Sequence, residues 1–376
     1  MQNHLHDMDE ENCCGCGACL QICPQSCISS AENKRGFAIP VIDAEKCVNC
    51  GLCKKVCPWQ SILRKNQVIE SYIAKAAQES VQKKCTSGGI FNLLAEEILK
   101  NGGVVYGCEW TDELLVHHVR VDRVENLPGL LQSKYVQSDT ERTFIEVKKD
   151  LNANRFVLYS GTACQLAGLK NFVGEHENLI LVEVACHGVP SPGLFREYIH
   201  WIEEKTQKNV VGFQFRNRKK HKKGEHYQLR INYSDGTEEF RYAAFDPYYA
   251  SFISGQTLRG VCYDCIYKGK DRVGDILLAD FWGAEKEHPE FHAENGASAV
   301  VILSSKGKEV FEKINVTCKP SSWEKVTAHN RSLIEGAEKT DFYQTIDINR
   351  FIPKVTAKTL LKVYMPEKIK YLLKRL

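Results

Sequence analysis

Apolar residues recur with two different periods along the chain, and the changes of period predict its elements. Between residues 86 and 102 the apolar side chains follow helical spacing, at Ile90, Phe91, Leu94 and Ile98. This pattern predicts a helix over about 88–100, with Ser87 as its N-cap and Gly102 at its end. The run GVVYGC at 103–108 predicts a short strand after it.

The middle of the chain alternates strand and helix patterns. RFVLYS (155–160) and NLILVEVA (178–185) read as strands, and GTACQLAGLKNF (161–172) and CHGVPSPGLFREYIHWI (186–202) as turns that lead into helices. Such units favour parallel strands with right-handed crossovers, whose carboxyl ends meet at one edge of the sheet. GDILLADFWG (274–283) predicts another buried strand, which ends in polar and aromatic residues. The predicted fold class is therefore mixed α/β.

Composition narrows the class of protein. The 376 residues include 43% hydrophobic residues, enough for a sizeable core, and carry a formal net charge of only +3. No apolar run approaches the roughly 20 residues of a membrane span, and no global positive field indicates nucleic-acid binding. The first twelve residues are polar and acidic rather than a secretory signal. We therefore expect a cytoplasmic protein with reduced thiols.

The cysteines follow a spacing that selects iron-sulfur clusters. Two runs read C-x2-C-x2-C-x3-C-P, with cysteines at 13, 16, 19 and 23 and at 47, 50, 53 and 57. This is the bacterial two-cluster ferredoxin pattern, in which the fourth cysteine of each run ligates the other cluster. The assignment gives Cys13, Cys16, Cys19 and Cys57 to a first 4Fe-4S cluster and Cys47, Cys50, Cys53 and Cys23 to a second. Two zinc sites would usually be built from separated C-x2-C pairs, and the spacing disfavours them. Cys14 and Cys27 lie outside the repeat and are interpreted as packed thiols.

A third group of cysteines lies further along the chain. Cys262 and Cys265 form a C-x2-C pair, which suits zinc, iron-sulfur or redox chemistry about equally. Cys164 and Cys186 follow consecutive predicted strands and are the natural candidates for two further ligands. We therefore predict a third 4Fe-4S cluster from these four cysteines, although buried unpaired cysteines without a ligand role remain an alternative.

Two basic segments have competing interpretations. RNRKKHKKG (216–224) carries six Lys or Arg residues and would attract an acidic partner, but strand patterns on both sides favour a solvated loop. EKIKYLLKRL (367–376) has the pattern of an amphipathic helix. A helix docked on its own domain is favoured over peripheral membrane contact, because so short a segment binds membranes only weakly.

Several segments together resemble the beta subunit of the coenzyme F420-reducing hydrogenase and dehydrogenase family. Besides the two cysteine runs they are TSGG (86–89), SKYVQS (133–138), GTACQLAGL (161–169), CHGVPSPG (186–193), LRGVCYDCIYK (258–268) and ADFWG (279–283). The resemblance implies an FAD in the α/β domain, with clusters that exchange single electrons with it and a flavin that exchanges hydride with an organic substrate. It implies flavin contacts from Ser87, Gly88, Gly89, Lys134, Tyr135, Gly161, Thr162, Gln165, Asp280, Trp282 and Gly283.

The expected organisation follows from motifs and resemblance together. Residues 1–65 form a two-cluster ferredoxin domain, 70–150 and 151–315 the two parts of a flavin-binding domain with the third cluster, and 316–376 a helical tail. The predicted function is electron transfer between clusters and FAD, with hydride transfer to or from a deazaflavin or another small acceptor. The physiological partner would be a ferredoxin or another redox protein. His187 is a candidate proton donor, or a hydrogen-bond partner of cluster sulfur. A non-catalytic electron-relay subunit is the alternative.

Overall fold

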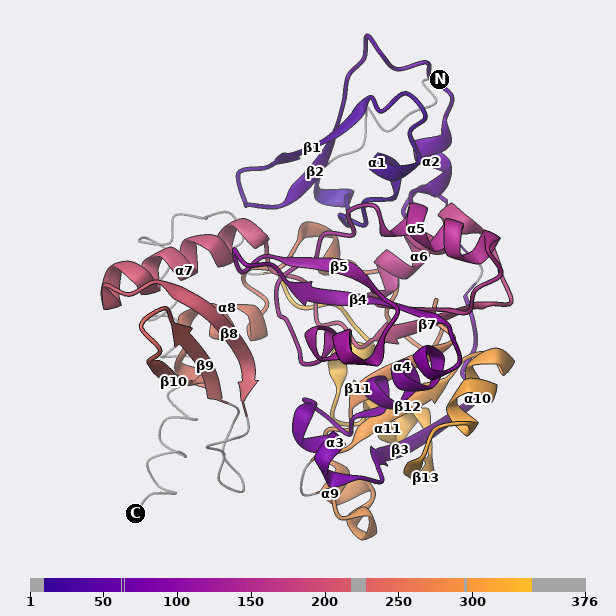
Figure 1. The fold of residues 1–376 in the computed structure, drawn as a ribbon, viewed down its shortest axis with the longest axis vertical. Coiled ribbons are helices and arrows are strands. Elements are labelled where there is room, and N and C mark those ends of the chain that lie inside the picture. The colour runs from indigo at the N-terminus through magenta and orange to yellow at the C-terminus, as the bar shows by residue number, and fades with distance from the viewer. Residues whose placement is uncertain (1–9, 62, 64, 218–227, 294–295, 340–376) are drawn as a thin grey trace.

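The computed structural model describes residues 10–61, 63, 65–217, 228–293 and 296–339. A small N-terminal module lies at one end of the molecule, on top of a larger body built around a central sheet (Figure 1). Among the described residues no helix is long and apolar enough to cross a membrane. The basic segment beyond Asn217 and the C-terminal segment 367–376 lie outside the described residues.

The N-terminal module is built from two nearly equivalent halves. Its helices are α1 (Ala18–Ile22) and α2 (Leu52–Val56), and its antiparallel hairpin consists of β1 (Ile28–Glu32) and β2 (Ala38–Ile42). Each helix starts after a glycine in the left-handed region, Gly17 at φ 73° and Gly51 at φ 76°. Each ends at a cysteine that precedes a proline, where the proline ring disfavours further helix. The sequence repeat is thus also a structural repeat.

The body contains one eight-stranded sheet in the order β13-β3-β12-β11-β7-β6-β4-β5. Its strands are β3 (Glu70–Ala76), β4 (Val104–Trp110), β5 (Val116–Val121), β6 (Val157–Gly161), β7 (Leu179–Val184), β11 (Ile276–Asp280), β12 (Ser298–Ile302) and β13 (Val316–Ser321). The four central strands β4, β6, β7 and β11 are parallel, as the alternating pattern predicts. β12 and β13 pair antiparallel with β3, so β3 runs in the direction of β11. The ends of β3, β4, β6, β7 and β11 therefore open on one edge.

Helices cover both faces of this sheet. On one face α4 (Ile90–Lys100) and α10 (Ser305–Glu312) pack against alternate strand residues such as Leu158, Ile180 and Val182. On the other face α5 (Thr143–Asn152) and α6 (Ala163–Val173) pack against the intervening residues, including Tyr159 and Leu181. The continuous apolar runs of β6 and β7 are explained by this double burial, because parallel strands covered on both faces need apolar side chains throughout.

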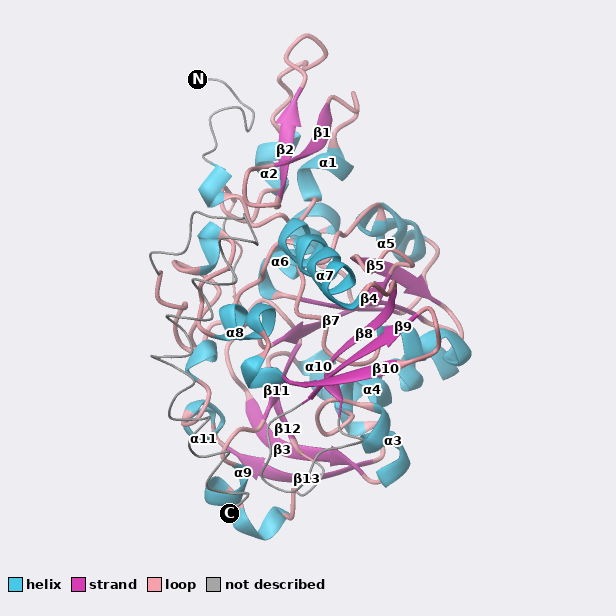
Figure 2. Cartoon of the chain, turned by 90° about the vertical axis from the view of Figure 1, so that its left-hand side faces the viewer, coloured by secondary structure: helices cyan, strands magenta, loops and turns pink. Residues whose placement is uncertain are grey.

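A smaller antiparallel sheet stands beside the main one. It consists of β8 (Val210–Asn217), β9 (Gln228–Tyr233) and β10 (Glu238–Tyr242), covered by α7 (Pro192–Thr206) and α8 (Pro247–Ile253) (Figure 2). Aromatic rings fill its core, with Phe195 against Tyr248 at 5.1 Å and Phe213 against Phe215 at 4.7 Å between ring centroids. The strand patterns on both sides of the basic segment are confirmed as β8 and β9.

The remaining helices complete the described chain. They are α3 (Glu79–Lys84), α9 (Ala284–Glu287) and α11 (Trp323–Thr327), with short 3-10 turns at Glu10–Asn12, Val124–Leu130, Ala243–Phe245, Gly260–Cys262, Pro289–Phe291 and Arg331–Leu333. Residues 316–321, expected in a helical tail, instead form the edge strand β13. Its side chains are mostly exposed, so no apolar period marked it as a strand.

The helix expected over 88–100 is confirmed as α4, with one correction at its start. Its N-cap is Gly89, which has φ 86°, and not Ser87. The Ser87 hydroxyl instead donates to the carbonyl of Ala297 at 3.0 Å and accepts from the Ser298 hydroxyl at 3.0 Å. The contact with β12 therefore takes the hydroxyl that a local cap would have used. Gly102 follows the helix end with φ 77°, as expected.

Candidate cluster and flavin site

The first cysteine group joins the two halves of the module. Cys13, Cys19 and Cys57 are all buried, and burial raises the pKa of the Cys19 thiol, with smaller contributions from the neighbouring Cys13 and Cys57. Cys57 comes from the second run, as the crossed ligand pattern requires. Cys53 also contributes to the Cys19 shift, which places the two groups close to each other.

The second cysteine group lines a cavity in the module. Cys47, Cys50 and Cys53 of the second run share this cavity with Cys23 of the first run, the set that the spacing assigns to one cluster. Cys27 lines the same cavity, and its sulfur lies 3.4 Å from that of Cys23. Burial raises the pKa of the Cys27 thiol to about 12. Cys50 is exposed, so this group faces the outside of the molecule.

The third group assembles at the carboxyl edge of the main sheet. Cys164 lies at the start of α6 after β6, Cys186 follows β7, and Cys262 and Cys265 lie in and just after a 3-10 turn. Burial raises the pKa of Cys186 to about 11, with repulsion from Cys164 and Cys265 adding to it. Burial likewise raises the pKa of Cys262, and Cys186, Cys164 and Cys265 add to that shift. All four thiols are thus mutual neighbours.

Donor chemistry bears on the kind of metal. Among the described residues, no group of three or more His, Cys, Asp or Glu side chains is arranged to hold a metal ion. The candidate donors of all three groups are cysteine thiols. Four cysteine thiolates are a donor set that 4Fe-4S clusters use. The three groups fit such clusters by donor chemistry.

Cations surround the third group. The Lys268 ammonium donates to the carbonyls of Cys186 and Ser332, and its charge lowers the pKa of Cys186 against the effect of burial. Charges of Lys268 and Arg272 also lower the pKa of Cys265, whose net shift is upward because burial dominates. Positive charges of this kind stabilise thiolates, the form that binds iron.

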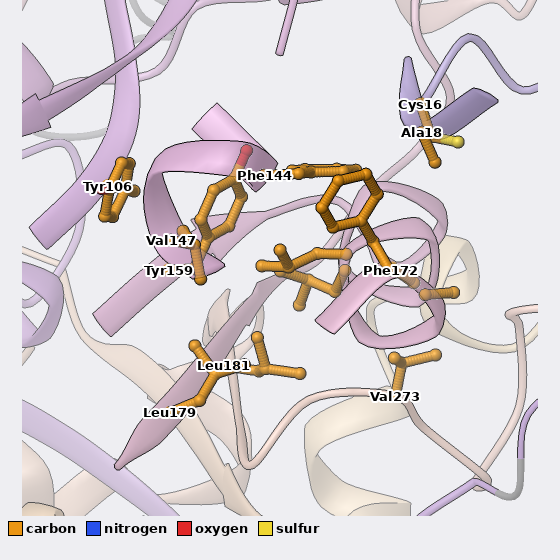
Figure 3. Close-up of a cluster of buried hydrophobic side chains, with 14 of the residues drawn as sticks. Cys16, Ala18, Tyr106, Phe144, Val147, Tyr159, Phe172, Leu179, Leu181 and Val273 are labelled. Atoms are coloured by element: carbon orange, nitrogen blue, oxygen red, sulfur yellow. The ribbon is translucent and has the colours of Figure 1, made fainter. Parts of the chain in front are cut away.

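The module is held against the body through the backbone of its first loop. The Gln137 side chain donates to the carbonyl of Cys14 at 2.9 Å, and the Thr140 hydroxyl donates to that of Cys16 at 2.9 Å. Cys16 and Ala18 lie beside the helix that carries Phe172 (Figure 3). Cys14 is buried there, and its thiol interacts with Cys164 as well as Cys16. The first and third groups are therefore adjacent.

The TSGG segment lies at the carboxyl end of β3. The Gly88 amide donates to the Ser298 hydroxyl at 3.0 Å, and its carbonyl accepts from the Ala76 amide at 2.7 Å. A β-carbon at Gly88 would meet the Ala74 carbonyl oxygen at 2.5 Å. Close packing and the positive φ of Gly89 thus account for both glycines. Ligand access is not needed to explain them.

The GTACQ segment caps helix α6. Thr162 and Gln165 form a capping box, and the Gln165 amide also donates to the Ser138 hydroxyl at 3.0 Å. Gly161 ends β6, and a β-carbon there would touch Gln165 at 3.3 Å. These contacts explain the three residues by local structure, and they hold Cys164 at the helix start.

Lys134 and Tyr135 lie between the two sheets. The Lys134 ammonium donates to the Leu131 carbonyl at 3.0 Å, and burial lowers the pKa of this lysine, opposed by Cys108 and Glu109. The Tyr135 ring stacks on Phe252, with 4.9 Å between centroids. A partly desolvated ammonium is suited to an anionic group, because little water screens its charge.

The ADFWG segment meets a residue that the sequence did not single out. The Arg216 guanidinium, at the end of β8, pairs with the Asp280 carboxylate at 2.6 Å and lies 5.8 Å from the centre of the Trp282 ring. The Arg216 side chain is buried, whereas Trp282 is 44% exposed. Gly283 has φ 75°, and the His329 ring fills the space where a β-carbon would be. Arg216 belongs to the basic segment 216–224, and nothing in the sequence indicated that it pairs with Asp280.

His187 sits beside the third group. Its Nε2 is buried without a hydrogen-bond partner among the described residues, and its ring meets Phe252 edge-on at 5.4 Å. Burial lowers the pKa of His187, and the nearby Lys268 lowers it further. Both effects favour the neutral imidazole.

The sheet thus brings four of the family segments to one edge. TSGG contacts the end of β3, GTACQ begins at the end of β6, CHG follows β7 and ADFWG spans the end of β11. SKYVQS joins this edge through the Ser133 hydroxyl, which donates to that of Thr86 at 3.2 Å. Open α/β sheets bind ligands at such an edge.

Comparison with known proteins agrees with this architecture. Residues 154–319 match the family model of the C terminus of the coenzyme F420 hydrogenase/dehydrogenase beta subunit. Residues 12–61 and 39–89 each match a model of a 4Fe-4S dicluster domain. The first match confirms the resemblance to the F420 hydrogenase/dehydrogenase beta-subunit family over residues 154–319. The other two support 4Fe-4S clusters in the N-terminal module.

Thirteen chains of solved structures match the chain. One belongs to a structure described as a xenon derivatization of the F420-reducing NiFe hydrogenase complex from Methanosarcina barkeri. It shares 13% identity, with a TM-score of 0.46 over 80% of this chain and 92% of that chain. No curated protein matches the chain.

Proposed function

We propose that the chain is an iron-sulfur flavoprotein oxidoreductase with three 4Fe-4S clusters and one FAD. Two contacts with α6 carry this proposal: the Cys14 thiol interacts with that of Cys164, and the Cys16 sulfur lies 2.8 Å from the place of a β-carbon on Gly168. The first cysteine group of the module and the third group of the body therefore meet at this helix. Electron transfer falls off steeply with distance, so a chain of close centres is what a redox path requires. The dicluster match over 12–61 supports the outer part of this path.

The order of the centres follows from burial. The second group includes the exposed Cys50, and exposed apolar residues Val48 and Leu52 border the same cavity. This group would exchange electrons with a ferredoxin or another redox protein. The first group, buried against α6, would pass them to the third group at the sheet edge. Exchange in the opposite direction uses the same order.

The flavin would lie at the carboxyl edge, between the third group and the surface. An FAD interconverts single-electron and hydride chemistry, which the clusters cannot do alone. In this proposal Lys134 would place its positive charge by the ring, and the start of α4, after Ser87, Gly88 and Gly89, would receive negatively charged groups. The residues that pack behind this part of the site would be Gly161, Thr162, Gln165 and Tyr135.

The acceptor side would be formed by the ADFWG segment. The exposed ring of Trp282 offers a flat apolar surface to an organic substrate, and the Arg216–Asp280 pair fixes the turn beneath it. Gly283 keeps this turn tight. The match over 154–319 supports a deazaflavin as one candidate substrate and other small hydride acceptors as alternatives. His187, whose Nε2 is buried, would act as a proton donor or as a hydrogen-bond partner of cluster sulfur near the third group.

The test is anaerobic purification followed by analysis of cofactors and turnover. Acid extraction should release FAD, and iron should be present at about twelve per chain. A reduced deazaflavin should then bleach the flavin and reduce the clusters. Absence of extractable FAD would eliminate this mechanism.

A non-catalytic relay subunit is the second candidate. The buried first group and the exposed second group suit a relay as well as an enzyme. A relay would exchange electrons with reduced ferredoxin without oxidising or reducing any deazaflavin or other small organic acceptor. Stopped-flow spectra with each reductant separate the two functions.

A further inference from the structure

Arg259 occupies the junction between the first and third cysteine groups. It lies three residues before Cys262, and its side chain reaches into the N-terminal module. Its Nε donates to the carbonyl of Cys13, its Nη1 to the Gln137 side chain at 2.7 Å, and its Nη2 to the Ala38 carbonyl at 2.7 Å. One guanidinium therefore ties together the first loop, the hairpin and the segment that carries Cys262.

The charge of Arg259 is buried without a carboxylate. The residue is 2% exposed, and all its acceptors are neutral carbonyl oxygens. The other two buried arginines differ, since Arg272 pairs with Glu183 at 2.7 Å and Arg216 pairs with Asp280 at 2.6 Å. Among the described residues no ion pair includes Arg259. A buried cation is strongly unfavourable unless negative charge lies near it.

The cysteine groups on both sides supply that negative charge once they hold clusters. A 4Fe-4S cluster with four thiolates is anionic, and reduction adds one more negative charge. Arg259 also contacts the third group directly, because the Cys262 amide donates to the Arg259 carbonyl at 2.9 Å. Reduction potentials of such clusters respond to nearby charge and hydrogen bonds.

The loop is shaped around this side chain. Gly15 has φ 67°, and a β-carbon there would lie 2.5 Å from Nη1 of Arg259 and 2.6 Å from Nε2 of Gln137. No larger residue fits while the guanidinium keeps its place. The glycine between Cys14 and Cys16 is thus required by Arg259 as well as by its backbone angle.

We propose that Arg259 is a positioning residue for electron transfer between the first and third clusters, and that its unpaired charge raises the reduction potential of both. The inference rests on the proposed function, because it needs a cluster on each side. Its hydrogen bonds fix the distance between the two centres. Its charge favours the reduced form of each, because reduction adds negative charge next to a cation.

The test compares two substitutions by redox titration followed with electron paramagnetic resonance. Arg259→Gln removes the charge, and the signals of the first and third clusters should move to more negative potentials. The second cluster, assigned to Cys23, Cys47, Cys50 and Cys53, should keep its potential as an internal reference. Arg259→Lys keeps the charge but not the three-way donor geometry, so potentials near those of the wild type are expected, with altered magnetic coupling.

Arg196→Gln serves as a matched control. Arg196 also links the body to the module, through Glu32 at 2.8 Å, but both side chains are about half exposed. Its removal should leave all potentials unchanged. Unchanged potentials in Arg259→Gln, or an equal shift of all three clusters, would overturn the proposal.

The iron content keeps the inference separate from the proposed function. If Arg259→Gln loses iron, the test rests on Arg259→Lys, which keeps the positive charge. A fall in the reduction potentials of its first and third clusters would then contradict the electrostatic role. Wild-type protein with about eight irons per chain would contradict the third cluster itself. Wild-type protein with about twelve irons and an unaffected Arg259→Gln variant would contradict only the role of Arg259.

Discussion

The sulfur of Cys16 lies 2.8 Å from the point where a β-carbon on Gly168 would stand. Gly168 is on α6, four residues after Cys164, and residues at this spacing share one face of a helix. The same helix face therefore contacts the first cysteine group through Gly168 and presents Cys164 to the third group. This helix and the hydrogen bonds of Arg259 would together set the distance between the two proposed clusters.

Gly168→Val should separate the module from the body. The new side chain would overlap the Cys16 sulfur and β-carbon, at 2.8 and 3.2 Å already from the first added atom. Overpacking of this kind lowers the free energy of unfolding by about 1–3 kcal/mol. We expect that loss in chemical denaturation, together with slower reduction of the third cluster by a donor that reduces the second.

Gly102→Ala is the control for this substitution. Nothing lies within 4 Å of a β-carbon at Gly102, but its φ of 77° imposes backbone strain of about 1–2 kcal/mol. Stability should therefore fall in the control without any change in electron transfer. Equal transfer rates in wild type and Gly168→Val would contradict the path through α6.

Cys262→Ala should remove one cluster and leave two. The Cys262 thiol interacts with Cys164, Cys186 and Cys265, so its loss takes one ligand from the third group alone. Iron should fall from about twelve to about eight per chain, with the ferredoxin signals retained. Cys108→Ala is the matched control, because Cys108 lies in β4, outside the three groups, and its loss should leave the iron content unchanged.

His118 should make stability depend on pH. This residue of β5 is buried, stacks on Tyr159 at 5.1 Å and donates from Nε2 to the Ser160 carbonyl at 3.0 Å. Burial lowers its pKa from 6.5 to about 4. Between these pH values the unfolded chain binds more protons than the folded one, so the free energy of unfolding falls as the pH falls through this window.

The expected size of this effect is about 3 kcal/mol at most, lost between about pH 6.5 and pH 4. His118→Phe should flatten the difference between unfolding at pH 5 and pH 7, measured anaerobically with denaturant. His200→Phe is the control, because the His200 side chain is 74% exposed and its loss should leave the slope in place. The same slope in wild type and His118→Phe would refute the assignment.

The sequence predicted the elements best where local pattern and tertiary packing agree. The β-α-β-α unit of β6, α6, β7 and α7 was predicted because its strands contain continuous apolar runs and alternate along the chain with helical patterns. The N-cap of α4 was misassigned because Ser87 bonds to β12, more than two hundred residues away. No local pattern reports such a contact.

The candidate site was predictable only where spacing in the sequence fixes spacing in space. Each of the two cysteine runs contains a glycine, Gly17 or Gly51, that starts an equivalent short helix, so the spacing of the cysteines in the sequence also determines their arrangement in space. No sequence pattern marked Arg259 or Arg216, because their roles depend on tertiary contacts with residues far away in the sequence. Arg259 stood in a recognised motif, but its contact with Cys13 spans 246 positions. Long-range polar contacts of single residues leave no periodicity to read.

The Arg216–Asp280 pair should be needed for flavin binding but not for the clusters. Asp280→Asn would leave the buried Arg216 charge without its carboxylate, at a loss on the order of 3 kcal/mol in stability. We expect FAD content to fall while iron stays at about twelve per chain, measured on the same anaerobic preparation. Asp122→Asn is the control, because its pair with Arg120 is largely exposed on the Asp122 side and its loss should change neither cofactor.

The double variant Arg216→Leu with Asp280→Leu separates stability from flavin binding. Removing both charges avoids the uncompensated cation, so the free energy of unfolding should recover toward that of the wild type. FAD should nevertheless stay low, because the turn that presents Trp282 has lost its anchor. If FAD returns together with stability, the pair acts only through folding. If FAD is retained even in Asp280→Asn, the flavin does not depend on the ADFWG segment, and the proposed acceptor side must lie elsewhere on the sheet edge.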